Sequence, residues 1–345
     1  MSILSGINEF FSLDIGSSSI RLVQLDGKGP VKNLVKYGFA PIAEKTPAVD
    51  STSNIIITDT IKNLISKSKI TTKNVVVGLP SQKVFTTVVE VNKIEPKEMS
   101  KSIKFQLGAF IPTPIEESKV DWSIIGDSPN DPNKVELLIS SVLNKVSQDR
   151  LDMLESIGLK VIALEPENLA LTRALLDPTN PKPQMVFDLG AFNSDLVISV
   201  NGAAMLTRSI NYGIESLVRA AMQDLNIKAE QAQEVIFKFG LDQARAQGQV
   251  YQAIINPVNA LLAEIDLSIK FFTNKYPNIK LDKIIVAGSA AVIPDFPLAL
   301  ANHTGINVEI GNAWRNVAFD TRKQNELISI SEYFGVAVGL AERKE

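Results

Sequence analysis

Apolar runs typical of strands alternate with stretches of helical periodicity between residues 10 and 80. Strands are expected over residues 10–14, 20–25, 34–39 and 74–78. A helix is expected over residues 56–68, because Ile57, Ile61 and Leu64 recur at three- and four-residue intervals. Strands and helices that alternate in this way predict an α/β layer structure.

The pattern changes between residues 81 and 161, and this part of the chain is interpreted as a small inserted subdomain. The expected elements are strands over 84–91, 120–125 and 135–142 and helices over 96–110 and 145–157. Pro112 and Pro114 end the first of these helices, since a residue before a proline avoids helical geometry. The insert holds no cluster of catalytic residue types, which favours contact with a partner as its role.

The second half of the chain repeats the order of the first, after a proline-rich seam at residues 177–183. The expected strands are 184–188, 196–200, 204–210 and 282–287. The expected helices are 214–225, 229–237, 257–276, 297–303 and 328–340. The last of these is expected to cross back to the first lobe.

A polar tip joins the first two strands of each half. The tips are Asp14-Ile15-Gly16-Ser17-Ser18-Ser19 and Asp188-Leu189-Gly190-Ala191-Phe192-Asn193-Ser194. Glycine can adopt backbone angles closed to other residues, so successive amide groups can point into one concavity suited to phosphate. Asp14 and Asp188 end their strands, where a carboxylate can hold Mg²⁺ through its water shell. One such tip is more often an ordinary turn, but its recurrence in both halves favours a bound anion.

Composition narrows the class of protein. A chain of 345 residues, 45% of them hydrophobic, is long enough to bury two cores. A net charge of −3 gives no basic surface for nucleic acid or anionic lipid. The absence of cysteine excludes disulfides and thiolate catalysis and fits a reducing cytoplasm. Residues 1–11 are too short and too polar for a signal peptide or membrane span, so a soluble cytosolic protein is expected.

Three features follow one another in a fixed order: the first tip, the second tip, and a strand–glycine turn at Val286-Ala287-Gly288. This order resembles the actin, chaperone and sugar-kinase superfamily of ATPases, in which related lobes close over ATP. The resemblance equates the three segments with the phosphate 1, phosphate 2 and adenosine motifs. Residues 163–170, with Glu165-Pro166, look like the first connecting segment. The implied fold is α/β and actin-like, with two duplicated lobes around a nucleotide cleft.

Within this superfamily, the chain resembles the PilM family of type IV pilus assembly proteins, relatives of the cell-division actin FtsA. The resemblance rests on residues 13–23, on 103–106 leading to Phe110-Ile111-Pro112-Thr113-Pro114-Ile115-Glu116-Glu117, on Glu264-Ile265 with Ser268, and on Ile293-Pro294. The Ile-Pro-x-Pro-x-Glu-Glu element indicates PilM rather than actins at large. The insert then corresponds to the FtsA/PilM-type small subdomain.

The resemblance also implies a division of the chain. The expected ranges are 1–80 for the core of the first lobe (1A), 81–161 for the inserted subdomain (1C-like), 162–181 for the return to the first lobe and the hinge, 182–227 and 281–312 for the core of the second lobe (2A), 228–280 for its helical subdomain (2B), and 313–345 for the crossing back to the first lobe.

Roles of single residues follow from the same resemblance. Asp14 and Asp188 would face Mg²⁺, and Glu165 with Asp188 would carry the catalytic step, in which Glu165 positions the attacking water. The residues expected to hold the phosphates are Gly16, Ser17, Ser18, Ser19 and Arg21 on one side and Gly190, Asn193 and Ser194 on the other. The residues expected around the ribose and base are Glu234, Lys238, Glu264, Ser268, Gly288 and Ser289. For Arg21, a solvated cation at the end of a strand is an equally good interpretation. The pairs Glu234 with Lys238 and Glu264 with Ser268 each lie on one face of a helix, and surface polarity explains them equally well.

Two departures from the superfamily pattern affect the expected activity. The adenosine loop reads Gly288-Ser289-Ala290 where relatives usually carry three glycines, and the second tip has Phe192-Asn193 where relatives favour threonines. Each added side chain restricts how closely the backbone approaches a purine. Slow or absent hydrolysis of ATP is therefore expected.

The function implied by the resemblance is that of a cytoplasmic ATP-binding scaffold of the type IV pilus or a related secretion machine. Its ligands would be ATP and Mg²⁺. Its partner would be the N-terminal cytoplasmic segment of a PilN-type bitopic inner-membrane protein, held between the first lobe and the insert. The pilus motor ATPases and a second copy of the chain are further candidate partners, and contact with the inner face of the membrane would come only through partners.

Two other classes remain as alternatives. A sugar kinase needs an aspartate general base in a polar substrate cleft, and no polar block of the sequence marks one. A filament-forming ATPase of the FtsA type usually adds a C-terminal amphipathic membrane helix, which residues 341–345 do not provide.

Overall fold

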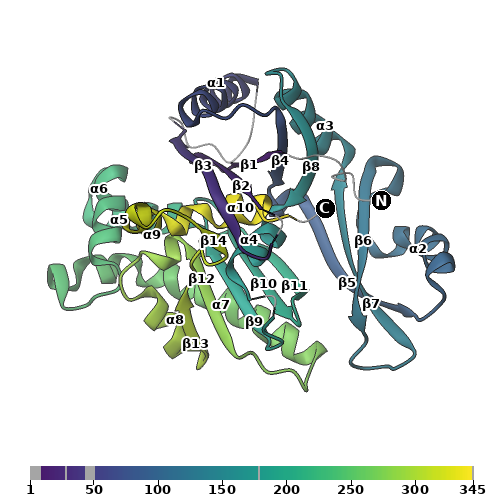
Figure 1. Cartoon of the computed structure of the whole chain (residues 1–345). Coiled ribbons are helices and arrows are strands. Elements are labelled where there is room, and N and C mark those ends of the chain that lie inside the picture. The colour runs from purple at the N-terminus through teal and green to yellow at the C-terminus, as the bar shows by residue number, and fades with distance from the viewer. Residues whose placement is uncertain (1–8, 28, 43–50, 178, 344–345) are drawn as a thin grey trace.

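The computed structural model describes residues 9–27, 29–42, 51–177 and 179–343, and these residues form two lobes with an insert beside them (Figure 1). Most of the N-terminal segment considered above lies outside the described residues. The mixed α/β architecture expected from the sequence is confirmed.

The first lobe is built on a mixed sheet in the order β14-β3-β2-β1-β4-β8. Its strands are β1 (Phe11–Ile15), β2 (Ser19–Asp26), β3 (Lys32–Pro41), β4 (Asn74–Leu79), β8 (Lys160–Pro166) and β14 (Val317–Ala318). The first three form an antiparallel meander, whereas β4 and β8 run parallel to β1. Every residue of β1 is buried, because helices cover both faces of the sheet. Helix α1 (Ser51–Ser68) packs on one face through Ile57, Ile61 and Leu64.

The second lobe repeats this plan with a sheet in the order β11-β10-β9-β12-β13. Its strands are β9 (Gln184–Leu189), β10 (Ser194–Val200), β11 (Ala203–Ile210), β12 (Lys283–Gly288) and β13 (Asn307–Ile310). Its helices are α5 (Ile214–Leu225), α6 (Ala229–Phe239), α7 (Gln249–Lys275) and α8 (Phe296–Thr304). These helices bury one face of the sheet in a single apolar core that includes Phe187, Leu217, Ile265 and Phe296.

Two helices lie between the sheets and hold the lobes together (Figure 1). They are α4 (Glu167–Leu175), which follows β8, and α10 (Ser331–Ala341), which follows the short α9 (Gln324–Ser329). The helices approach closely because a Cβ on Gly335 would overlap Leu171, and a Cβ on Gly339 would overlap the backbone of Ala170. Leu171 also packs in one cluster with Val186 of the second sheet. The two helices therefore form a packed layer between the sheets.

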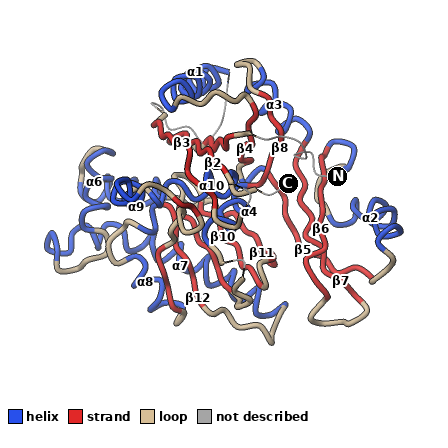
Figure 2. Tube along the Cα trace, viewed as in Figure 1, coloured by secondary structure: helices blue, strands red, loops and turns tan. Residues whose placement is uncertain are grey.

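The insert is a separate antiparallel sheet in the order β5-β7-β6 with a helix on one face (Figure 2). Its elements are β5 (Val84–Asn92), α2 (Pro96–Phe110), β6 (Ser118–Asp127) and β7 (Lys134–Leu143). Ile103 and Leu107 of α2 pack on Leu137 and Ile139 of β7. Helix α3 (Asn144–Glu155) continues directly from β7, and its Met153 and Leu154 belong to the core of the first lobe. One helix thus joins the insert to the first lobe.

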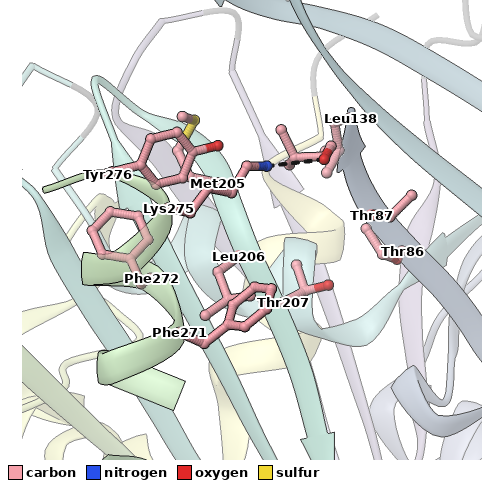
Figure 3. Close-up of a pocket in the computed structure, with 11 residues that line it drawn as sticks. Thr86, Thr87, Leu138, Met205, Leu206, Thr207, Phe271, Phe272, Lys275 and Tyr276 are labelled. Carbon is pink, nitrogen blue, oxygen red and sulfur yellow. Dashed lines mark hydrogen bonds between the residues drawn. The ribbon is translucent and has the colours of Figure 1, made fainter. Parts of the chain in front are cut away.

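The insert also contacts the second lobe around a small cavity of about 90 Å³ (Figure 3). Lys275, at the end of α7, donates from Nζ to the carbonyl of Val88 in β5 at 3.0 Å. The neighbouring Tyr276 donates its hydroxyl to Oε1 of Glu136 at 2.5 Å. Burial raises the pKa of Glu136 and of Tyr276. The insert therefore contacts both lobes.

Some elements differ from those expected. The long helix was expected to begin at Pro257, but α7 begins at Gln249 and contains Pro257 in its interior. Val250, Ala253 and Ile254 precede the proline, and their burial extends the apolar face of the helix towards its N-terminus. This packing outweighs the backbone hydrogen bond that the proline cannot donate. The short strands β13 and β14 carry too few residues to give a periodic signal, and they were not expected.

Candidate functional site

A cavity of about 1150 Å³ lies between the lobes and is lined by both polar tips. Residues 14–19 of the first tip and 188–193 of the second line it, together with the beginning of α4 and part of α10. Volumes of this size are typical of small-molecule sites, which lie preferentially between domains.

The tips share one backbone geometry. The amide of Gly16 donates to the carbonyl of Ser19 at 3.0 Å, and the amide of Gly190 donates to the carbonyl of Asn193 at 3.0 Å. A Cβ on Gly16 would lie 3.1 Å from the Ser19 carbonyl oxygen, and a Cβ on Gly190 would lie 2.8 Å from that of Asn193. The backbone therefore excludes a side chain at Gly190, whereas a side chain at Gly16 would press on the Ser19 carbonyl and on Arg21 Nη1, 2.9 Å away. Neither glycine has a positive φ, so the expectation of special backbone angles at the tips is wrong.

The residues behind the tips pair differently in the two lobes. In β1–β2, Asp14 lies opposite Arg21, and Arg21 Nη1 donates to Asp14 Oδ2 at 3.0 Å. At the same register in β9–β10, Asp188 lies opposite a second acid, Asp195. Like charges directly opposite in a sheet are destabilising. Burial, together with the charge of Asp195, raises the pKa of Asp188 to about 7, and burial also raises the pKa of Asp195 and of Asp14.

Asp195 was missed by the sequence analysis. The available signal was its position in the repeat, because aligning Asp188 with Asp14 aligns Asp195 with Arg21. Asp195 lines the cavity, and its Oδ1 is buried without a hydrogen-bond partner in the described part of the protein.

Glu165 lies outside the residues that line the cavity. Its Oε2 accepts from Arg173 Nη1 at 3.3 Å and from Arg343 Nη1 at 2.8 Å, its Oε1 accepts from Arg173 Nη2, and the residue is 4% exposed. Both oxygens are therefore used to join β8 to α4 and the C-terminal segment. The sequence analysis chose this residue from its Glu-Pro signature, which carries no information about where the side chain points.

Glu167 is the carboxylate of this segment that lines the cavity. The chain turns from strand to helix at Pro166, and Glu167 is the first residue of α4. Its side chain packs on Gly78, where a Cβ would come within 2.9 Å of Glu167 Cγ. Its Oε1 is buried and lacks a hydrogen-bond partner among the described residues. Burial raises the pKa of Glu167 well above its usual range, and the charges of Asp14 and Asp195 raise it further.

Gly288 and Ser289, at the end of β12, line the cavity as expected. Gly288 has a φ of +59°, and a Cβ there would overlap Asp188 and come within 2.7 Å of the Leu189 carbonyl oxygen. This glycine is required both by its backbone angle and by the close approach of β9.

Ser194, which was expected to hold a phosphate, and the other residues expected near a nucleoside lie outside the described cavity lining. Ser194 is 1% exposed and donates its hydroxyl to the carbonyl of Tyr212 at 2.6 Å. Arg208 of β11 donates to Glu264 Oε2 at 2.6 Å and to Ser268 Oγ at 2.9 Å, so this pair joins β11 to α7. Glu234 and Lys238 are exposed on α6, and the adjacent Gln233 and Phe237 line the cavity instead. Helix α6 thus lines the cavity, but it does so through residues that each precede an expected one by one position.

The cavity also contains positive charge. Arg21 lines it from β2, and Arg150 lines it from α3. Within the described residues, no group of three or more His, Asp or Glu side chains is arranged to hold a metal ion directly. Mg²⁺ usually keeps several of its waters and needs only one or two carboxylates beside substrate phosphates. The unpartnered oxygens of Asp195 and Glu167 fit that mode of binding.

The sequence matches a known family over most of its length. The family described as "Type IV pilus assembly protein PilM" matches residues 12–345. A solved structure titled "PilM-PilN type IV pilus biogenesis complex" aligns with a TM-score of 0.81 and 23% identity, covering 96% of this chain and 97% of that one.

More distant structures share the fold. MreB5 of Spiroplasma citri bound to ADP aligns with a TM-score of 0.58 and 13% identity, covering 96% of this chain and 95% of that one. The ethanolamine utilization protein EutJ from Carboxydothermus hydrogenoformans aligns with a TM-score of 0.57 and 12% identity, covering 96% and 88%. The expected actin-like fold is confirmed. Among the described residues, none of the helices has the length and apolar character needed to cross a membrane.

Proposed function

Since the chain belongs to the family of type IV pilus assembly protein PilM, we propose that it acts as a nucleotide-binding, actin-like scaffold of a type IV pilus machine. The observation that carries this proposal is the pair of matching tips facing one cavity. A long polyphosphate is the ligand class that can contact both tips at once. Among polyphosphates ATP fits best, because the turn at Gly288 lines the same cavity and would contact the purine.

The phosphates would be held by backbone amides and hydroxyls of the tips. Ser17, Ser18 and Asn193 line the cavity beside the two glycines, and Arg21 adds a positive charge paired with Asp14. Micromolar affinity corresponds to about 8 kcal/mol, whereas one hydrogen bond to a charged group contributes about 1.5 to 3 kcal/mol. Neither tip suffices alone, so nucleotide binding would favour closure of the lobes on each other.

Asp14, Asp188 and Asp195 would hold Mg²⁺ through its water shell. The like-charged pair Asp188 and Asp195 is the part of the site that gains most from a cation, since its mutual repulsion is then offset. When bound, the metal ion would neutralise charge on the phosphates and polarise the phosphoryl group.

Glu167 would orient the attacking water and accept its proton, in the role that the sequence analysis gave to Glu165. Its carboxylate lines the cavity, and it has an oxygen without a partner in the described structure. Burial, together with the charges of Asp14 and Asp195, raises the pKa of Glu167. Only the ionised carboxylate can accept a proton, so a raised pKa would make hydrolysis slow.

The partner would be the N-terminal cytoplasmic segment of a PilN-type inner-membrane protein. The structural similarity to a PilM–PilN complex and the family membership support this choice. The segment would lie between the first lobe and the insert, where α3 runs from β7 into the core of the first lobe. Recruitment through this partner would place the protein at the inner face of the cytoplasmic membrane.

A peptide titration tests this function. A fluorescent peptide with the sequence of a PilN-type N-terminal segment is added to the full chain with and without Mg-ATP, and binding is followed by anisotropy. The proposal expects saturable binding whose affinity changes with ATP. If the peptide binds neither with nor without Mg-ATP, the scaffold role is excluded. If it binds with the same affinity in both conditions, the nucleotide has no part in peptide binding.

A further inference from the structure

Arg150 is a partly buried arginine whose guanidinium has one buried nitrogen, Nη1, without a hydrogen-bond partner among the described residues. It lies on α3 and lines the cavity between the lobes. Its Nη1 is buried and lacks a hydrogen-bond partner, and no ion pair joins its guanidinium to a described carboxylate. Burial lowers the pKa of Arg150, while the charges of Glu167 and Asp14 act to raise it.

Arg21, which lines the same cavity, differs from Arg150 because it forms an ion pair. Its Nη1 donates to Asp14 at 3.0 Å, and only its Nε is buried without a partner in this part of the structure. A buried charge is costly unless it is paired and hydrogen-bonded. The charges of Glu167 and Asp14 offset part of this cost for Arg150, but its buried Nη1 has no acceptor among the described residues, so its position is suited to an anion that arrives from outside the chain.

We propose that Arg150 binds the terminal phosphate of ATP and is the residue through which the insert responds to the nucleotide. This inference rests on the proposed nucleotide function and adds to it a residue that carries no motif. A guanidinium presents planar donors that match phosphate oxygens, which makes arginine the usual residue for this contact. The terminal phosphate is the relevant one because Arg150 lines the cavity within electrostatic reach of Asp14 and Glu167, the residues assigned to the metal ion and to the attacking water.

The position of Arg150 in the chain explains how the contact would reach the insert. Helix α3 follows β7, the central strand of the insert, without an intervening loop. Met153 and Leu154 anchor the same helix in the core of the first lobe. A phosphate bound by Arg150 would stabilise one position of α3, and the attached strand would follow it. By thermodynamic linkage, a peptide that favours the same position would strengthen ATP binding by the same factor.

Nucleotide titrations of the full chain test the inference. Wild type, Arg150→Gln and Arg150→Lys are titrated with Mg-ATP and Mg-ADP by calorimetry. Lys160→Gln is the matched control, because it removes one exposed positive charge just after α3 and away from the cavity lining. Arg150→Gln should weaken ATP binding about 10- to 100-fold and ADP binding less than about threefold, since it removes charged hydrogen bonds to one phosphate. Arg150→Lys should fall between, and Lys160→Gln should match wild type.

The outcomes separate the inference from the function on which it rests. If wild type binds ATP and Arg150→Gln binds ATP and ADP as wild type does, the inference is overturned and the nucleotide function stands. If wild type binds no nucleotide, the function fails, and tripolyphosphate then becomes the probe. Thermal stabilisation of wild type but not of Arg150→Gln by tripolyphosphate would still support an anion site at Arg150, and equal or absent stabilisation would overturn it.

Discussion

Asp188 and Asp195 lie directly opposite each other across β9 and β10, at the register where the first lobe pairs Asp14 with Arg21. The duplicated hairpin thus carries an ion pair in one lobe and two acids in the other. The ion pair balances its charges within the protein, whereas the hydrogen bonds to Asp195 from Ser81 and Ser209 leave the repulsion between the two acids, which a proton or a cation would relieve. The second lobe therefore provides the part of the cleft that is suited to a metal ion.

The two acids predict an unusual pH dependence of stability. The pKa of Asp188 rises from its ordinary value of 3.8 to about 7 in the folded protein. Because the folded pKa is the higher one, the stabilisation from this group is complete below about pH 4 and is lost as the pH rises towards 7. Asp195→Asn should remove part of this loss, about 1 to 2 kcal/mol between pH 5 and pH 8. Urea unfolding in EDTA at both pH values measures it.

Asp224→Asn is the control for that prediction, because it removes an exposed acid from α5 of the same lobe. Its pH dependence should equal that of wild type. If Asp195→Asn also follows wild type at both pH values, the repulsion between the two acids contributes nothing to stability.

Glu167→Gln should separate binding from turnover. The amide keeps the shape of the side chain but cannot accept a proton from water, so hydrolysis should fall at least about tenfold. ATP affinity should change less than about threefold, because the side chain is assigned to the water and not to the phosphates. Phosphate release under single-turnover conditions and calorimetry measure the two effects. Unchanged hydrolysis would exclude Glu167 as the base.

Glu165→Gln should lower the stability of the protein rather than its hydrolysis of ATP. The Glu165 carboxylate is paired with Arg173 and Arg343, and Arg173 also donates to the carbonyl of Gly339 in α10 at 2.7 Å. Loss of the negative charge leaves two partly exposed arginines unpaired, and the free energy of unfolding should fall by about 2 kcal/mol. Chemical denaturation measures the loss. A variant of wild-type stability whose hydrolysis is lost would instead restore Glu165 to the catalytic role.

Tyr276→Phe should weaken the contact between the insert and the second lobe. The change leaves the buried Glu136 without its hydroxyl donor, at a cost of about 1 to 3 kcal/mol. Glu136→Gln keeps a hydrogen-bonding group in place and should be milder. A double-mutant cycle by chemical denaturation gives the coupling between the two positions. Additive effects would mean that the hydrogen bond does not join the two parts.

Local sequence patterns predicted the parts of the site that lie within one hairpin. The Asp-x-Gly tips and the turn at Gly288 could be found because strand, glycine and acid are neighbours in the chain. The reason for the tip glycines could not be found in this way, since it is a close approach to the carbonyls of Ser19 and Asn193 rather than a backbone angle.

The remaining site residues depend on contacts between distant segments. Arg150 is an ordinary helical arginine in sequence, and only the packing of α3 on the first lobe brings it to the cavity. Glu165 and Glu167 cannot be distinguished from the sequence alone, because both are glutamates next to Pro166. The turn from strand to helix at Pro166 brings Glu167, and not Glu165, to the cavity. The division of the chain into ranges stays a prediction, and α3 shows why such boundaries are hard to draw, because it continues from the insert while its apolar residues pack in the first lobe.

The most direct test of the account is calorimetry of Mg-ATP with wild type, Gly16→Ala, Gly190→Ala and the control Gly108→Ala. A Cβ at either tip glycine would press on the turn carbonyl, whereas a Cβ at Gly108 in α2 would meet no atom within 4 Å in the described structure. The account predicts one ATP per wild-type chain, an affinity at least about tenfold weaker in each tip variant, corresponding to about 1.4 kcal/mol, and no change in Gly108→Ala. No heat of binding with wild type, or equal affinity in all four proteins, would contradict it.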